Sequence, residues 1–180
     1  DATANALQLG ASVAVNGTCL TVTRVVQGHV HFDVITESLR TTNLSRLEVG
    51  DLVNVERSYH VGDEIGGHIL SGHVTATSPL SGRFVQGHDH VLRFNLEPKW
   101  LKYVFHKGFI GLDGASITVS SLDRADSWFE VSLIPETLSR TTLGQIEAGG
   151  LVNVEVDGQT VTTVETVERI MSEREVASKP

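Results

Sequence analysis

The chain has 180 residues and a formal net charge of −8, with 40% hydrophobic and 20% charged residues. Because phosphate binding needs a concentrated basic face, 14 Lys and Arg residues against 22 Asp and Glu residues argue against a nucleic-acid partner. No apolar run is long enough to span a membrane, and no signal peptide is visible in a chain that opens on Asp1. The single cysteine excludes a disulfide framework and a cysteine-rich zinc site, and it predicts a reducing, cytoplasmic compartment.

The first third of the chain has the pattern of short strands separated by turns. Residues 1–9 are expected to form two helical turns, and strands are expected at 12–16, 19–25, 30–35 and 51–57. Asn16-Gly17 between two alternating runs is a strong hairpin signal, because both positions tolerate positive φ. Residues 37–44 form a short helical or irregular connection. Short strands with frequent turns indicate an all-β barrel or sandwich, and closure would cover the exposed edges.

The second part of the chain adds two helical signals to this β pattern. Residues 66–74 place glycines at the entrance to a strand, and residues 83–95 form a hairpin with Gly87-His88-Asp89 at its tip. Residues 97–105 predict a short helix with Pro98 in its first turn. After the last strand, apolar residues recur every three or four positions and predict an amphipathic helix without a partner face in the chain, which favours self-association. They are Val161, Val164, Val167 and Met171.

An internal repeat connects the two parts. Residues 10–22 (GASVAVNGTCLTV) align without a gap with residues 107–119 (KGFIGLDGASITV), so Asn16 matches Asp113 and Cys19 matches Ser116. The match continues through FDV and FEV, ESL and ETL, and a second copy of LVNVE. A repeat of this length predicts two copies of one small domain. We expect domains at residues 1–60 and 61–158, followed by an oligomerisation helix and tail at 159–180.

The motifs NGTCLTV, ESLRTTNL, VNVER, GGHILSGH, KGFIGLDGASITV, SLIPETLSRTTLG and VNVEVD, in this order, resemble the riboflavin synthase α-chain family, which includes lumazine proteins. The resemblance covers nearly the whole chain. It implies an all-β fold of two tandem, internally repeated small closed β-barrels, six-stranded and of Greek-key type, followed by a C-terminal α-helix. It also implies a homotrimer joined through that helix, with lumazine synthase as a further partner.

The same resemblance implies a reaction. Each barrel would hold one 6,7-dimethyl-8-ribityllumazine, and a four-carbon unit would pass from one to the other, giving riboflavin and 5-amino-6-ribitylaminopyrimidinedione. No metal or redox cofactor is implied. Two lumazines must meet face to face, and the short linker at residues 59–64 restricts how two pockets of one chain can meet. We therefore expect the site to lie between subunits, so that trimerisation is necessary for activity.

This sequence departs from the family at its start. Family members begin with a Met-Phe-Thr-Gly-Ile-Val strand and a hairpin that precede Asp1, and the strand corresponds in the repeat to residues 71–74. Without these elements the first barrel is expected to be open along an unpaired edge. The simpler expectation is that the segment exists in the molecule and lies outside this sequence.

The resemblance assigns two ligand sites, in which Thr hydroxyls and backbone groups bond the polar edges of the ligand and apolar side chains cover its ring. The first site consists of Ser12, Cys19, Leu20, Thr21, Asp33, Val34, Ile35, Thr36, Glu37 and Ser38. The second site consists of Gly72, His73, Val74, Lys107, Ser116, Ile117, Thr118, Ile134, Pro135, Glu136, Thr137, Leu138 and Ser139.

The reaction removes a proton from a ring methyl group, so it needs an acid and a base. The candidates are His73, Ser116 and Asp157, with Cys19 as a nucleophile or proton relay in the other copy. The residues alone do not choose among them. The remaining histidines show no metal-ligand spacing, which predicts no metal site and gives them surface or structural roles. They are His29, His31, His60, His68, His88, His90 and His106.

Two other functions compete with the synthase. A non-catalytic lumazine- or flavin-binding protein of the same family typically loses the motif of one copy, whereas both copies here keep their polar site residues. An unrelated pair of carbohydrate- or peptide-binding barrels would need an aromatic platform, and only 6% of the residues are aromatic. Both observations favour the enzyme.

Overall fold

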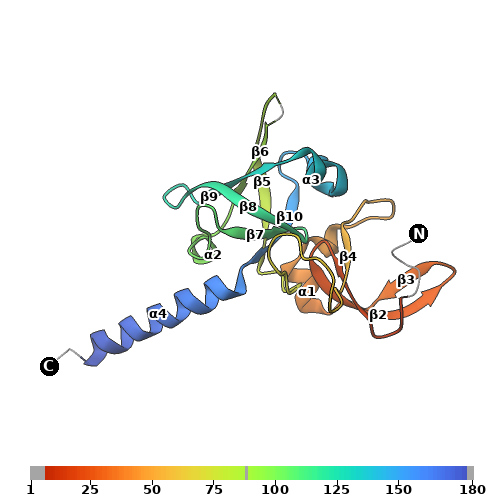
Figure 1. The fold of residues 1–180 in the computed structure, drawn as a ribbon, viewed down its shortest axis with the longest axis horizontal. Helices are drawn as coiled ribbons and strands as arrows, with labels where there is room; N and C mark the ends of the chain where they lie inside the picture. Colours follow the sequence, from red (N-terminus) through yellow and green to blue (C-terminus); the bar gives the residue numbers. More distant parts are fainter. Residues whose placement is uncertain (1–6, 88, 178–180) are drawn as a thin grey trace.

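A computed structural model describes residues 7–87 and 89–177, which form two β units and a long terminal helix (Figure 1). Most of the predicted helical turns at residues 1–9, and His88 at the hairpin tip, lie outside the described residues. Residues 7–10 contain a turn and no helix. No helix among the described residues has the length and apolar character needed to cross a membrane.

The first unit is an open antiparallel sheet with the strand order β3-β2-β1-β4. The predicted Asn16-Gly17 turn joins β1 to β2, with φ of 44° and 74° at the two residues. The last two predicted strands are shorter than expected, and the predicted connection is a short helix followed by a 3₁₀ turn. The elements are β1 (Ser12–Val15), β2 (Thr18–Val26), β3 (His29–Phe32), α1 (Thr36–Thr41), η1 (Asn43–Arg46) and β4 (Val55–Arg57).

The second unit is a closed six-stranded barrel with the order β10-β5-β6-β9-β8-β7. The elements are β5 (Ala76–Gln86), β6 (Asp89–Asn95), α2 (Pro98–Leu101), β7 (Phe109–Leu112), β8 (Ala115–Asp123), β9 (Trp128–Leu133), α3 (Pro135–Arg140), η2 (Thr142–Gly144) and β10 (Leu151–Val156). The helix expected at residues 97–105 is only α2. The strand expected from residue 66 begins at Ala76, because Gly67 and Gly72 have φ near 80°, which a strand does not accommodate.

The repeat relates the two units strand by strand, with β1, β2, β3 and β4 matching β7, β8, β9 and β10. The second barrel closes because β5 and β6 bridge β10 to β9. Within residues 7–60 no strand bridges β4 to β3. The second unit is thus the expected closed six-stranded barrel, and the first unit as described has the open edge expected for a barrel without the family's first strand and hairpin.

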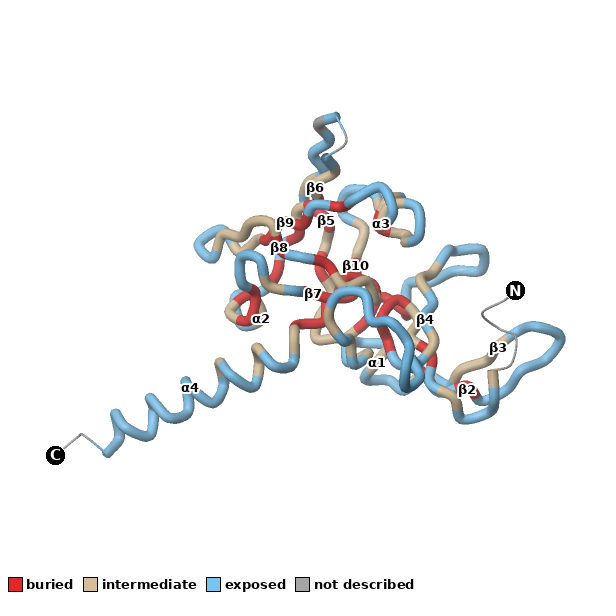
Figure 2. Tube along the Cα trace, in the orientation of Figure 1, coloured by how far each residue is buried: buried red, intermediate tan, exposed pale blue. Residues whose placement is uncertain are grey.

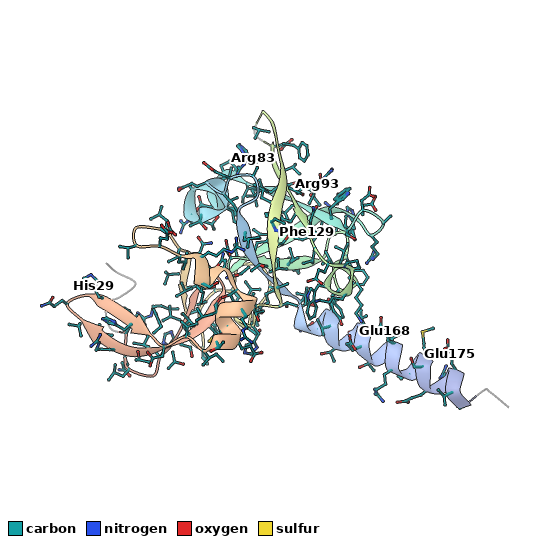
Figure 3. All side chains as sticks on the ribbon, turned by 180° about the vertical axis from the view of Figure 1, so that it is seen from behind. His29, Arg83, Arg93, Phe129, Glu168 and Glu175 are labelled. Carbon is teal, nitrogen blue, oxygen red and sulfur yellow. The ribbon has the colours of Figure 1, made fainter. Side chains whose placement is uncertain are left out.

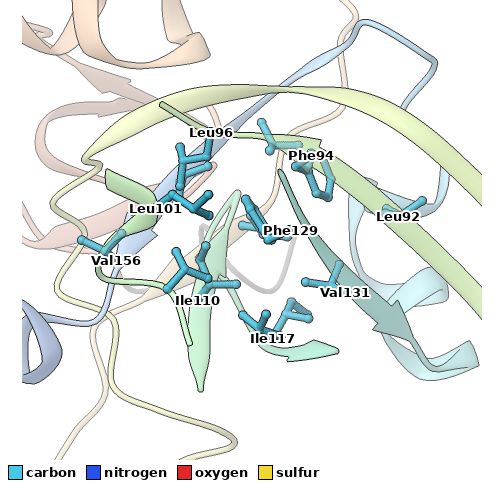
Figure 4. Close-up of a cluster of buried hydrophobic side chains, with 14 of the residues drawn as sticks. Leu92, Phe94, Leu96, Leu101, Ile110, Ile117, Phe129, Val131 and Val156 are labelled. Atoms are coloured by element: carbon cyan, nitrogen blue, oxygen red, sulfur yellow. The ribbon is translucent and has the colours of Figure 1, made fainter. Parts of the chain in front are cut away.

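The two units differ in how they bury apolar side chains. The barrel encloses a core in which Phe94 and Phe129 stack with ring centroids 5.6 Å apart (Figure 4). The apolar face of the first sheet instead lines a groove of about 610 Å³, with Leu20 and Phe32 among its walls. Buried segments accordingly concentrate in the barrel and where the units meet (Figure 2).

Two glycines bring the units into backbone contact. A Cβ on Gly17 would lie 2.6 Å from the backbone nitrogen of Gly114, and a Cβ on Gly114 would lie 2.8 Å from the nitrogen of Gly17. Both glycines also have positive φ. Only glycine fits such an approach, so the two matching turns of the repeat meet back to back.

A polar network surrounds this contact, and four of its hydrogen bonds form two pairs that match between the copies. The backbone N–H of Asn54 donates to Asn16 Oδ1 at 2.8 Å, as the backbone N–H of Asn153 donates to Asp113 Oδ1 at 2.7 Å. Asn54 Nδ2 donates to the Asp113 carbonyl at 2.9 Å, as Asn153 Nδ2 donates to the Asn16 carbonyl at 2.8 Å. Asn43 adds a bond from its Nδ2 to Asp113 Oδ1 at 3.0 Å. We call this set of five residues the junction network.

Helix α4 (Gly158–Ala177) leaves the barrel as a long arm (Figure 1). Its first turns pack on the barrel core through Val161 and Val164, so the expectation that the helix lacks a partner face in the chain is wrong for this part. Lys102 fixes the direction of the arm by donating to Glu165 at 3.0 Å and to Glu168 at 2.7 Å. Beyond Glu168 the arm extends away from the barrel towards Glu175 (Figure 3), and apolar side chains on it are exposed.

The junction network predicts a pH-dependent stability. Burial raises the pKa of Asp113 to about 7, although hydrogen bonds from Asn153 and Asn43 oppose this. A raised carboxyl pKa favours the protonated folded state, so this stability is present below about pH 4 and is lost as pH rises through about 7. Asparagine is the residue at the matching position of the first copy and cannot ionise, so Asp113→Asn should not lose stability as pH rises. At pH 8 its free energy of unfolding should exceed that of the unaltered chain by on the order of a few kcal/mol.

Thermal unfolding of Asp113→Asn and of the unaltered chain at pH 5 and pH 8 tests this. The stability advantage of the variant should grow with pH. Asp126→Asn, at an exposed position in the turn after β8, is the control and should keep the pH dependence of the unaltered chain. Parallel pH profiles for Asp113→Asn and the unaltered chain would contradict the prediction.

Candidate functional site

A cavity of about 710 Å³ lies where the first sheet, the second barrel and the segment between them meet. Ser12 and Cys19 line it from the first unit, and Ser116 lines it from the second. His68 and Gly72 line it from the connecting segment. The structure thus brings expected site residues of both copies to one cavity, which we call the shared cavity.

The connecting segment runs between the two matching residues of the repeat. Gly67 lies against Ser116, where a Cβ would overlap the serine oxygen. Gly72 lies against Cys19, whose backbone amide donates to the Gly72 carbonyl at 2.9 Å. The sequence grouped Gly72 with the second site, whereas in the structure it contacts the first copy's Cys19.

Ser116 is hydrogen bonded to His68 in two ways. The His68 amide donates to Ser116 Oγ at 3.0 Å, and His68 Nδ1 lies 2.6 Å from the same oxygen. In the tautomer with the ring proton on Nε2, the Ser116 hydroxyl donates to Nδ1; Nε2 is buried and has no hydrogen-bond partner among the described residues. The ring stacks on Phe109 with centroids 5.1 Å apart. The stacking and the two contacts with Ser116 fix the orientation of the imidazole.

His68 is a site residue that the sequence interpretation missed, because it was grouped with the surface or structural histidines. A signal existed, since Gly67-His68 has the same glycine-histidine step as Gly72-His73 five residues later. The step alone could not show which histidine reaches Ser116. His73 is exposed, and its backbone amide donates to Ser71 Oγ at 3.3 Å.

Burial and charge act in opposite directions on His68. Burial lowers the pKa of His68, and the nearby carboxylates of Asp157 and Glu155 raise it in part, leaving it below the ordinary histidine value. The imidazole is therefore neutral at pH 7. A neutral imidazole that accepts a hydrogen bond from a serine hydroxyl is an arrangement suited to proton removal.

Asp157 caps the long helix. Its Oδ2 accepts from the Thr160 amide at 2.8 Å and from Thr160 Oγ1 at 2.6 Å, as an N-cap residue does. Burial alone would raise the pKa of Asp157. The two hydrogen bonds from Thr160, a third from the backbone amide of Gln159 and the interaction with the nearby His68 outweigh burial, so the pKa is lowered. Asp157 is thus a charged group facing His68 and a weak proton acceptor. Its counterpart Ser58 donates from Oγ to the Ser12 carbonyl at 3.1 Å.

The other expected site residues lie outside the lining of the shared cavity. Ile117 is buried in the barrel, and Leu20 and Val34 line the apolar groove of the first unit. The remaining residues are half-buried or exposed: Thr21, Asp33, Ile35, Thr36, Glu37, Ser38, His73, Val74, Lys107, Thr118, Ile134, Pro135, Glu136, Thr137, Leu138 and Ser139. Ile35 and Ile134 are matching N-cap residues, 66% and 63% exposed, so each short helix presents an apolar side chain at its start. No group of ligands suited to a metal ion occurs among the residues described.

Comparisons with known proteins identify the family of the chain. The family model of the lumazine binding domain matches residues 1–58 and 71–157. The riboflavin synthase of Escherichia coli K12 is 49% identical over 172 residues, which are 95% of this chain and 80% of that protein. The riboflavin synthase of Mycobacterium tuberculosis H37Rv is 44% identical over 164 residues, 90% of this chain and 80% of that protein.

Solved structures show the same fold. LumP complexed with riboflavin superposes with a TM-score of 0.75 at 27% identity, covering 84% of this chain and 81% of that chain. LumP complexed with 6,7-dimethyl-8-(1'-D-ribityl) lumazine also gives a TM-score of 0.75, at 24% identity and with 84% and 80% covered. With two copies of the domain and this identity over most of its length, the chain belongs to the riboflavin synthase family.

Proposed function

We propose that this chain is a riboflavin synthase, which transfers a four-carbon unit between two molecules of 6,7-dimethyl-8-ribityllumazine to give riboflavin and 5-amino-6-ribitylaminopyrimidinedione. The observation that carries this proposal is the Ser116–His68 pair, which lies in one cavity with Cys19 of the other copy. The names of the relatives at 44% to 49% identity agree with it.

The duplicated fold suits a duplicated substrate. Holding two reactants in a fixed orientation can lower the barrier by about 7–11 kcal/mol, because the entropy of bringing them together is lost on binding. The reaction needs no external oxidant or reductant, since one lumazine gains the four carbons that the other loses. The protein therefore supplies orientation and proton transfer.

The geometry suggests how the proton moves. Ser116 Oγ takes a proton from the ring methyl group while its own proton passes to Nδ1 of the neutral His68 over 2.6 Å. The charge of Asp157 stabilises the imidazolium that forms. Cys19 lies at the matching place of the other copy, where a thiol replaces the hydroxyl, so the two lumazines meet different groups.

Ser116→Ala and His68→Gln test this assignment. Each should lower the rate of riboflavin formation by about 100-fold or more, because general-base assistance contributes about 10²–10⁴. Lumazine binding, followed by its fluorescence, should change little. Ser132→Ala, at an exposed position on β9, is the matched control and should keep full turnover. Unchanged turnover in Ser116→Ala would remove Ser116 from the mechanism.

The second candidate function is non-catalytic binding of lumazine or flavin. The solved complexes of LumP, which share this fold, favour it. In that case the unaltered chain would bind lumazine with a shifted, stable fluorescence and would form no riboflavin. The Ser116–His68 pair, which simple binding does not require, favours the enzyme.

A homotrimer assembled through α4 completes the proposal. Beyond the turns that pack on the barrel, Val167, Ile170 and Met171 are 50%, 40% and 58% exposed. The connecting segment runs between Cys19 and Ser116, with Gly67 against Ser116 and Gly72 against Cys19, and this separation favours two lumazines meeting between subunits. Association with lumazine synthase would supply substrate directly, and a reducing cytoplasm suits the free Cys19 thiol.

The double variant Ile170→Glu, Met171→Glu tests assembly without disturbing Val161 and Val164, which pack on the barrel core. Buried charges would oppose association, so we expect single-chain mass in light scattering and at least about tenfold lower turnover, with lumazine binding retained. Ser172→Glu adds a charge at a neighbouring exposed polar position of the arm and should preserve both. A fully active single-chain species would disprove the requirement for assembly.

A further inference from the structure

Glu155 is a buried charged residue that the proposed mechanism does not use as a reacting group. Its side chain is 8% exposed on β10, two residues before Asp157. Oε1 accepts from the Ser71 amide at 2.6 Å and from Ser71 Oγ at 2.7 Å, and Oε2 accepts from the Gly72 amide at 3.1 Å. Three donors to one carboxylate make strong, charge-assisted hydrogen bonds.

These bonds hold the part of the connecting segment that touches the first unit. The Gly72 carbonyl accepts from the Cys19 amide at 2.9 Å, and a Cβ on Gly72 would lie only 2.5 Å from Cys19 Cβ. The His73 amide donates to Ser71 Oγ, which itself donates to Glu155. The segment is thus fixed between a carboxylate of the second unit and the cysteine of the first.

Among the described residues, the matching position of the first unit has a different environment. Glu56 holds the matching place in β4, and there the residue is exposed. A buried carboxylate without donors would cost several kcal/mol, so the docking of Ser71 and Gly72 and the burial of Glu155 stabilise each other.

We propose that Glu155 is a positioning residue for the ligand site of the first copy. Through Ser71 and Gly72 it holds the connecting segment against Cys19, so the second unit sets the shape of a site whose other residues come from the first. The identity of the ligand rests on the proposed function, whereas the positioning of the segment does not.

Glu155→Gln in the full chain tests the positioning. Glutamine keeps the size of the side chain, but its amide nitrogen cannot accept, so Ser71 or Gly72 loses a partner. We expect the amide protons of Gly72 and Cys19 to exchange about tenfold faster in NMR hydrogen exchange, the effect of about 1.4 kcal/mol. The amides of Leu92 and Val131, in the barrel core, should keep their rates.

Glu130→Gln is the matched control, because it removes another half-buried carboxylate of the same barrel, one that is paired with Arg93 at 2.8 Å. It should leave the exchange of Gly72 and Cys19 unchanged. If Glu155→Gln does not fold, Ser71→Ala removes one of the three donors and should accelerate the same amides by about threefold.

Titration with 6,7-dimethyl-8-ribityllumazine gives the second readout, with an expected loss of about tenfold in affinity at one of two sites per chain. Unchanged exchange at Cys19, or equal acceleration throughout the barrel, would overturn the proposal. Faster exchange with unaltered binding would overturn it too, because the segment would not shape the site. If the unaltered chain forms no riboflavin, the proposed function fails, and the exchange result still decides the role of Glu155.

Discussion

The back-to-back contact of Gly17 with Gly114 is the constraint on which the rest of the structure depends. It brings the two turns so close that the asparagines of one copy bond the backbone of the other. Several of the polar groups are then satisfied by hydrogen bonds across the two units. Cys19 and Ser116, each two residues after its glycine, are thereby held on either side of the connecting segment, and the shared cavity follows from the same contact.

Features that depend on neighbouring residues in the sequence could be predicted, whereas features that depend on contacts between distant residues could not. The Asn16-Gly17 hairpin is a local signal and is confirmed, as is the closed second barrel. The short helix at Pro98 ends sooner than its apolar spacing predicted, because a run of helical spacing carries no stop signal. The apolar spacing of α4 was recognised, but contacts of Val161 and Val164 with the barrel depend on tertiary packing, which periodicity does not reveal.

The candidate site shows the same division. Cys19 and Ser116 could be found because they sit in matching motifs, and the structure places both at one cavity. His68 could not be separated from the other histidines, since its role depends on Gly67 allowing the segment to approach Ser116. Asp157 is a candidate from the sequence, and the structure adds a helix cap that a single sequence position does not disclose.

The junction network also bears on how a duplicated protein can change over time. Asn54 and Asn153 each bond the turn of the opposite copy, so a substitution at either removes a contact between the two halves. Cys19 and Ser116, which line the shared cavity, take no part in these reciprocal bonds and are different residues in the two copies. The contacts between the halves thus favour similar residues in the two copies, whereas the cavity is where the two copies of one ancestral domain have come to differ in chemistry.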